Sequence, residues 1–193
     1  MTSNITNPER LYSRSEVLSK PSPVPTESGL YAWYFADIPS AVPVEGCLKS
    51  DGKTLLYLGI SPDKSSKPNS TQNLNKRVTY HYRGNAEGST LRRTLGILLS
   101  DSSGYPLRRV GSGRRMTLTH SGEDWLNEWM EANAFVCWIT HERPWEIEED
   151  LIASTSVPLN IRGNQSHPFY PSLRVLRRDA ISRARELSVA DNS

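Results

Sequence analysis

The sequence predicts an α+β fold in which helices flank a small three-stranded antiparallel sheet, with an extra β-hairpin and a C-terminal helix. Three short apolar runs are each bounded by turn-forming residues, which is typical of buried strands. Between and after these runs, apolar residues recur every three or four positions, which is the period of an amphipathic helix. Strands and helices therefore alternate along one chain, as expected for this fold class.

Length and composition are those of an ordinary globular protein. A chain of 193 residues is long enough to bury a core as one domain with extensions. No apolar run approaches the roughly 18 residues that a membrane span needs, and the N-terminus has no apolar signal core. Cys47 and Cys137 are too few for a disulfide framework, and the histidines lack zinc-finger spacing. We therefore expect a cytoplasmic protein without a membrane partner.

The first predicted strand covers residues 28–35 and is aromatic and apolar throughout. A second strand, residues 55–61, is expected to pair antiparallel with it, and a third covers residues 134–140. Within the second strand, Gly59 leaves a gap in the side-chain row close to Tyr57. Such a gap marks a bulge or a place where a ligand comes close. By itself, Tyr57 also fits a core residue whose phenol tip reaches the surface.

Two helices are predicted after the second strand. In the first, apolar residues recur every four positions from Leu74 to Tyr82, and Gly84 ends the helix. On a neighbouring face of this helix, Arg77 and His81 are also four residues apart, so their side chains lie side by side.

The second of these helices begins at Ser89, which is a good N-cap residue. Its apolar stripe is expected to be buried, which leaves Arg92 and Arg93 facing solvent or a ligand. Three further helices are predicted to start at Ser121, at Pro144 and at Ser172, the last of them rich in arginine.

A β-hairpin is predicted within residues 105–120, with its turn at Gly111-Ser112-Gly113 and an arginine pair on each side. The net charge of +2 is too small to indicate a nucleic-acid partner. Local basic patches, however, make an electrostatic footprint for a phosphate backbone. An ordinary exposed turn is the alternative for this hairpin. The candidate nucleic-acid-binding residues are Arg92, Arg93, Arg108, Arg109, Arg114 and Arg115.

Short motifs on the predicted elements resemble the GIY-YIG nuclease superfamily. Its first signature element is matched by Gly29-Leu30-Tyr31, and its second by Tyr57-Leu58-Gly59. The family then places an arginine in a helix, often with a histidine or tyrosine four residues later. A glutamate in a later helix and an asparagine after a proline-containing turn complete the pattern. These later elements are matched, in order, by Arg77 with His81, by Glu148 and by Asn160.

Two long insertions indicate the branch of the superfamily. The connection between Tyr31 and Tyr57 and the loop between Ser61 and Asn73 are longer than in homing and repair members. Such insertions resemble the restriction-endonuclease branch, which also favours histidine after the arginine. The expected organisation is an extended lead-in over residues 1–26, a nuclease domain over residues 27–165, and a C-terminal helical extension and tail over residues 166–193.

The resemblance implies metal-dependent hydrolysis of phosphodiester bonds. Glu148 would be the single protein ligand of Mg²⁺ or Mn²⁺, a hard ion that completes its shell with water and phosphate oxygens. Arg77 would hold a phosphate oxygen with its planar guanidinium. Either Tyr31 or Tyr57 would take a proton from the attacking water. Its phenolate form would be stabilised near Arg77, the metal and His81.

The resemblance also gives Asn160 a supporting role, in which its hydrogen bonds fix the site backbone or a tyrosine. We expect an endonuclease that acts on DNA in restriction or defence, because 193 residues leave little room for a separate targeting region. Two alternatives stay open: a nuclease that acts on RNA, and a non-catalytic nucleic-acid-binding protein that keeps the fold. The oligomeric state is left open.

Overall fold

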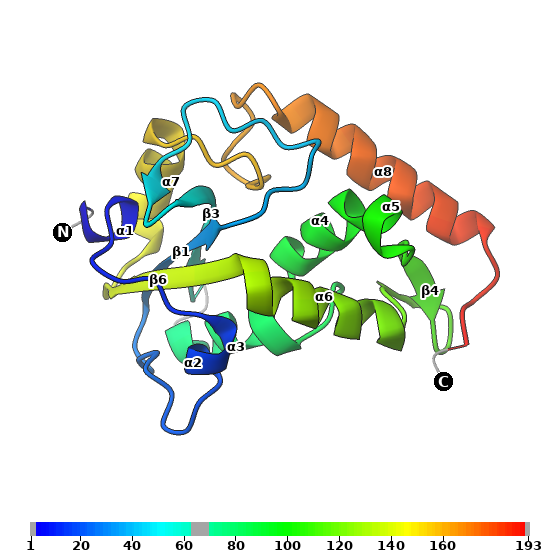
Figure 1. Cartoon of the computed structure of the whole chain (residues 1–193), viewed down its shortest axis with the longest axis horizontal. Helices are drawn as coiled ribbons and strands as arrows, with labels where there is room; N and C mark the ends of the chain where they lie inside the picture. Colours follow the sequence, from blue (N-terminus) through cyan, green and yellow to red (C-terminus); the bar gives the residue numbers. More distant parts are fainter. Residues whose placement is uncertain (1–2, 63–69, 192–193) are drawn as a thin grey trace.

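The computed structural model of the chain describes residues 3–62 and 70–191 (Figure 1). Most of the long loop predicted after Ser61 lies outside these residues. The main sheet is antiparallel, with the strand order β2-β3-β1-β6. Its strands are β1 (Gly29–Phe35), β2 (Lys49–Ser50), β3 (Lys53–Ser61) and β6 (Ala134–Thr140).

The three predicted strands form the sheet, and β2 adds a fourth, two-residue strand at its edge. This addition follows from a tight turn at Asp51 and Gly52, both of which have positive φ. An Asp-Gly pair in that conformation is typical of a two-residue hairpin turn, so the chain folds back and pairs β2 with the start of β3.

The central strand, β1, is buried along its whole length. Successive side chains of a strand point to opposite faces of the sheet. Trp33 and Phe35 therefore enter the larger of the two cores that flank the sheet, whereas Leu30 and Tyr34 enter the core on the other face. Because both faces are covered, the strand is a continuous apolar run rather than an alternating one.

Helices cover both faces of the sheet (Figure 1). The larger core contains residues of α2 (Arg14–Val17), α3 (Leu74–Arg83), α4 (Thr90–Leu98), α6 (His120–Asn133) and α8 (Tyr170–Glu186). The core on the other face contains residues of α1 (Ser3–Thr6) and α7 (Trp145–Ser154). A single turn, α5 (Ser100–Ser103), follows α4.

Side-chain caps fix where these helices begin. Asn73 accepts a hydrogen bond from the backbone N–H of Lys76, and Ser89 accepts one from Arg92, so the starts of α3 and α4 are as predicted. The helix predicted from Ser121 begins at His120 instead, because Thr119 is its N-cap and accepts from the third residue of the helix.

The N-terminal lead-in, predicted as an extended segment, packs on the sheet. Ile5, Val17 and Val24 are buried in the two cores. Tyr12 exchanges two backbone hydrogen bonds of 2.9 Å with Val136 of β6. This pairing covers the outer edge of β6, whose free backbone groups would otherwise invite pairing with another chain.

The predicted hairpin is formed by β4 (Arg108–Val110) and β5 (Arg115–Thr117). It lies beside the end of α8 (Figure 1), where the N–H of Ala190 donates to the carbonyl of Arg109 at 2.8 Å. At the other end of α8, its N-cap residue Phe169 and Leu173 in its first turn lie in the larger core. The C-terminal helix is therefore anchored at both ends.

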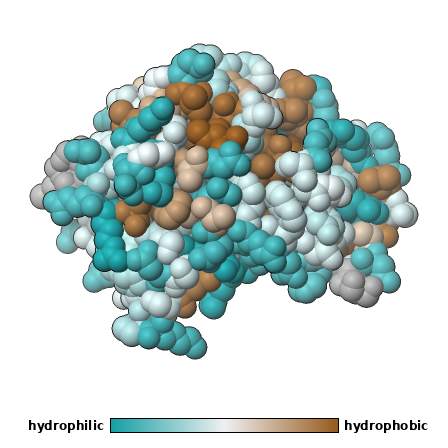
Figure 2. All heavy atoms as spheres, in the orientation of Figure 1, coloured by the Kyte–Doolittle hydropathy of each residue, from teal (hydrophilic) through white to brown (hydrophobic). Residues whose placement is uncertain are grey.

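Within residues 3–62 and 70–191, no helix is long and apolar enough to cross a membrane. Figure 2 shows hydrophobic residues gathered over the β1–β2 connection and α8, with hydrophilic residues over much of the rest of this face.

Candidate active site

A pocket of about 590 Å³ opens where β1 and β3 meet α3, the start of α4, and α7. Five of the six residues predicted to be catalytic line it: Tyr31, Tyr57, Arg77, Glu148 and Asn160. The sixth, His81, is fully buried and bonded to Tyr31. Residues that are far apart in the sequence thus converge on one concave surface.

Gly59 makes room for the ring of Tyr31. The two residues are partners across the β1–β3 pair. A Cβ atom on residue 59 would lie 2.5 Å from the hydroxyl oxygen of Tyr31 and 2.6 Å from its Cζ atom, which is closer than real Cβ contacts allow. The gap predicted beside Tyr57 is therefore filled by Tyr31, the tyrosine of the first signature element.

A buried chain of hydrogen bonds runs from Tyr31 through His81 to Ser89. The Tyr31 hydroxyl lies 2.9 Å from Nε2 of His81, and Nδ1 of His81 lies 2.7 Å from Oγ of Ser89. Burial lowers the pKa of His81 well below its usual range, and the charges of Arg77 and Arg92 lower it further. The imidazole is therefore neutral at neutral pH, with one nitrogen donating and the other accepting.

Ser89 decides which nitrogen of His81 carries the hydrogen. Its Oγ already accepts a hydrogen bond from the backbone N–H of Arg92. In the described part of the chain, Nδ1 of His81 is the acceptor within reach of the Ser89 hydroxyl proton. Because a buried hydroxyl proton is rarely left unbonded, Ser89 donates to Nδ1. The Nε2 hydrogen of His81 then donates to the oxygen of Tyr31.

Tyr57 has a different environment, with a side chain that is 8% exposed in the pocket wall. Burial raises the pKa of Tyr57 well above its usual value, and the neighbouring Tyr31 raises it further. Arg77 acts in the opposite direction with a smaller effect. Tyr57 therefore keeps its proton at neutral pH, and its hydroxyl is a hydrogen-bond donor.

Arg77 and Glu148 bring opposite charges to the pocket. Nη1 of Arg77 donates to the carbonyl of Gly88 at 3.2 Å, which fixes the guanidinium at the start of α4. Both charged groups shift the pKa of Tyr57, Arg77 lowering it and Glu148 raising it, so both lie close to that phenol. Glu148 is half-buried, whereas Glu146, Glu149 and Asp150 on the same helix are exposed. This difference agrees with the choice of Glu148 among the acids of α7.

Asn160 bonds the backbone of β3, which is one of its two predicted roles. Its Oδ1 accepts from the N–H of Leu58 at 2.9 Å, and its Nδ2 donates to the carbonyl of Leu58 at 2.8 Å. Asn164, which sequence reasoning missed, donates to the carbonyls of Val157 and Asn160. The turn after α7 thus bonds the β3 backbone as a neighbouring strand would, and it fixes the part of β3 that lines the pocket.

The family model of the GIY-YIG catalytic domain matches residues 29–179, which is more than half of the chain. The chain belongs to the GIY-YIG family. The predicted membership is therefore confirmed, and with it a nuclease domain. The match continues beyond residue 165 into α8. Comparison with the curated proteins and with the solved structures gives no match.

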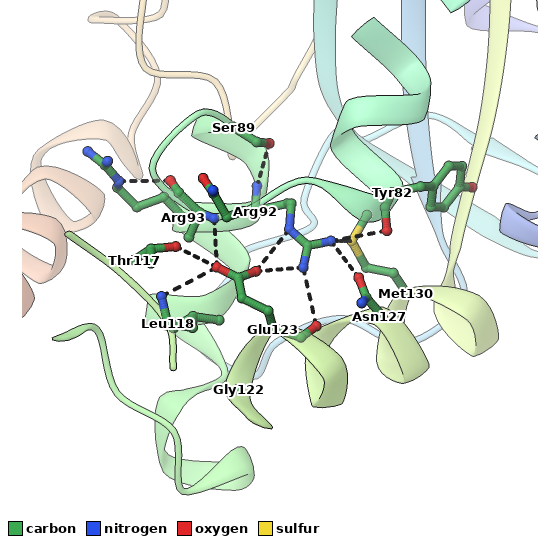
Figure 3. Close-up of polar contacts among 12 residues, drawn as sticks. Tyr82, Ser89, Arg92, Arg93, Thr117, Leu118, Gly122, Glu123, Asn127 and Met130 are labelled. Carbon is green, nitrogen blue, oxygen red and sulfur yellow. Dashed lines mark hydrogen bonds and ion pairs between the residues drawn. The ribbon is translucent and has the colours of Figure 1, made fainter. Parts of the chain in front are cut away.

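One prediction about nucleic-acid binding by this GIY-YIG domain is wrong, because the arginine concerned is buried. Arg92 was expected to face solvent or a ligand, but its side chain is fully buried. Figure 3 shows why: α6 supplies Glu123, whose Oε2 lies 2.6 Å from Nη2 of Arg92. Arg92 also donates to Asn127 and to the carbonyls of His81 and Tyr82 at the end of α3. It is a structural residue that holds the backbone of His81, where a cation also suits the helix dipole.

The other predicted arginines differ from one another. Arg108 and Arg109 donate to backbone carbonyls in the last turn of α8 and just after it, and so fasten this end of α8 to the hairpin. Arg93 is half-buried, and Arg114 and Arg115 at the turn are exposed. Two of the hairpin arginines thus have an internal structural role, and two stay accessible to a ligand.

The donor set of the pocket fits a divalent ion that is shared with substrate. Nucleases of this family generally depend on such an ion. Among the described residues, Glu148 is the one carboxylate that lines the pocket, and no group of three or more metal-binding side chains was found. Mg²⁺ often binds through one or two carboxylates, with waters and substrate phosphates as its other ligands. Glu148 and a bound phosphate would supply such a shell.

Proposed function

We propose that this protein is a metal-dependent endonuclease that hydrolyses phosphodiester bonds in DNA, in a restriction or defence role. The observation that carries the proposal is the convergence of Tyr31, Arg77 and Glu148 on one pocket, with His81 bonded behind Tyr31. A phenol, a guanidinium and a carboxylate are the groups that a one-metal phosphodiesterase needs for the base, the phosphate and the ion.

Of the two tyrosines, Tyr31 is the one we assign as the general base. A hydrogen bond from Nε2 of His81 to the Tyr31 oxygen favours the phenolate form, because hydrogen bonds to a charged group stabilise it. Among residues 3–62 and 70–191, no imidazole donates to Tyr57 in this way, and the burial of Tyr57 disfavours the phenolate. Tyr31 then takes the proton of the attacking water, while the hydroxyl of Tyr57 donates to a phosphate oxygen.

The remaining groups bind and orient the phosphate. Arg77 donates to a non-bridging oxygen with a guanidinium that Gly88 already holds in place. Glu148 would hold Mg²⁺ or Mn²⁺. When bound, the ion would polarise the phosphate and stabilise the leaving oxygen. Asn160 keeps the β3 backbone beneath these groups in register.

The choice of DNA and of a restriction or defence role rests on the sequence. The long connections on either side of Tyr57 are similar to those of the restriction branch, as is the histidine four residues after Arg77. The exposed Arg114 and Arg115 offer charge for the nucleic-acid backbone outside the pocket.

The test is nicking of supercoiled plasmid with Mg²⁺ or with EDTA. We expect Mg²⁺-dependent nicking by the wild type and its loss in Glu148→Ala. The matched control is Glu149→Ala, which removes an exposed acid from the same helix and is expected to keep full activity. Equal behaviour of the wild type and Glu148→Ala, with DNA binding retained, would instead identify a non-catalytic DNA-binding protein. A parallel RNA assay distinguishes an RNA nuclease.

A further inference from the structure

Arg93 on α4 and Arg177 on α8 are both half-buried. The two helices pack against each other. Burial, and then the charge of Arg93, lower the pKa of Arg177 to about 10. The charge of Arg93 therefore acts on Arg177, and an anion bound between two such like charges would relieve their repulsion.

The acceptors that hold the two arginines are neutral. Nη1 of Arg177 donates to Oγ1 of Thr94 at 2.6 Å, and Arg93 donates to three backbone carbonyls. Within residues 3–62 and 70–191, neither arginine has a carboxylate at ion-pair distance. The neighbouring Arg92 is the contrast, because it points away from Arg93 and pairs with Glu123 (Figure 3).

Both guanidiniums keep donors for a ligand. A guanidinium has five N–H donors. In the described structure, Arg177 uses its Nη1 in one hydrogen bond, and Nη1 of Arg93 makes none. The unused donors are not sealed in the interior, since the buried unpaired donors among the described residues belong to Trp33 and Arg108. An anion between α4 and α8 would therefore meet open N–H groups from both sides.

The pair continues the surface of the active-site pocket. Arg177 lowers the pKa of Tyr57, and Tyr57 raises that of Arg177, so the two groups lie within electrostatic reach of each other. Thr90 lines the pocket, and Thr94, which holds Arg177, lies one helical turn further on the same face of α4. A DNA strand that runs from Tyr57 along α4 would pass over the two arginines.

We propose that Arg93 and Arg177 together bind one backbone phosphate of the DNA strand, adjacent to the phosphate that is cleaved. This inference rests on the proposed function and adds a second phosphate site to it. Planar guanidiniums match phosphate oxygens two at a time. Contacts of this kind fix the register of the strand without reading its sequence. The pair is therefore expected to position the scissile bond over Tyr31 and Glu148.

The experiment measures duplex DNA binding over a salt series by fluorescence anisotropy, in the Glu148→Ala background so that the DNA stays intact. Because each neutralised phosphate contributes about −0.9 to the slope of log K against log salt, Arg93→Gln/Arg177→Gln is expected to make that slope less steep by about 0.9. The matched control is Arg174→Gln/Arg178→Gln, which removes the same charge from exposed positions on α8 and is expected to leave the slope unchanged.

Equal loss of slope in the two double variants, or no loss in either, overturns the phosphate site. If the Arg93→Gln/Arg177→Gln protein fails to fold, Arg177→Met decides, since it keeps the packing of the side-chain stem. For Arg177→Met, the slope of log K against log salt must also become less steep than that of the Glu148→Ala background. Nicking by the wild type separates the two proposals: nicking with an unchanged slope rejects the phosphate site alone. A wild type that neither nicks nor binds DNA rejects both.

Discussion

The ring of Tyr31 lies over Gly59, so that any Cβ at residue 59 would stand 2.5 Å from the Tyr31 hydroxyl oxygen. The glycine of the second signature motif therefore sets the position of the tyrosine of the first. A side chain at residue 59 must displace the phenol that we propose as the general base.

Gly59→Ala is expected to lower the rate of nicking by about 100-fold, because a misplacement of about 1 Å at a reacting group costs that much. The rate constant at saturating DNA is the measurement. The control is the same substitution in a Tyr31→Phe background, where the base is already absent and little further loss is expected. Full additivity of the two losses would show that Gly59 acts independently of the Tyr31 hydroxyl.

Ser89→Ala is expected to move the limb of the pH–rate profile that reports Tyr31 to higher pH. Without the Ser89 hydroxyl, Nδ1 of His81 can carry the hydrogen instead of Nε2, and the Tyr31 phenolate loses its donor. Loss of the N-cap also costs about 1 kcal/mol of stability, but that loss alone moves no pH limb. Ser89→Thr keeps a hydroxyl and should restore the profile. An unshifted limb in Ser89→Ala would limit Ser89 to its capping role.

Much of the fold was predictable because its signals are local. Caps such as Asn73 and Ser89 fix helix starts by bonding a backbone N–H three residues away, and both starts were predicted correctly. The motif positions also placed Tyr31, Arg77 and Glu148 in one pocket, as expected from the resemblance. In each case the deciding residues lie within one element or one motif.

What sequence reasoning missed depends on partners that are distant along the chain. The stripe on α4 predicted that Arg92 lies off the apolar face, but could not reveal that α6 brings Glu123 against it. For the same reason Ser89 was predicted only as a cap. Its hydrogen bond to His81 depends on α3, which places His81 next to Ser89. Arg177 is one of several arginines on α8, and the sequence does not distinguish it from the others. It lies near Tyr57 because α8 packs on α4.

Glu123→Gln is expected to lower the free energy of unfolding by about 3–5 kcal/mol, because it leaves the buried Arg92 charge without its partner. The matched control is Glu131→Gln, since the Arg14–Glu131 pair is partly exposed, with side chains 22% and 42% accessible. Such a pair contributes less than about 1 kcal/mol. Urea unfolding measures both losses. A loss of under about 1 kcal/mol in Glu123→Gln would contradict the structural role of Arg92.

The burial of His81 predicts how stability changes between about pH 6.5 and pH 5. In the unfolded chain a histidine titrates near 6.5, whereas the pKa of the folded His81 lies well below that value. Below pH 6.5 the unfolded state therefore binds a proton that the folded state does not. The free energy of unfolding therefore has its full contribution from neutral His81 above pH 6.5. It decreases as the pH is lowered below 6.5, by at most about 1.4 kcal/mol per pH unit.

Urea unfolding at half-unit pH steps measures this slope. His81→Gln is expected to be less stable at every pH but to have a flatter slope than the wild type. His167, whose pKa burial also lowers, contributes in the same direction, so His167→Gln is the control and should flatten the slope less. Glu16 and Asp51 have lowered pKa values, and their ordinary values of 4.5 and 3.8 place their effect at lower pH. Parallel slopes for the wild type and His81→Gln would mean that His81 titrates alike in the folded and unfolded states, and would contradict the lowered pKa of the buried imidazole.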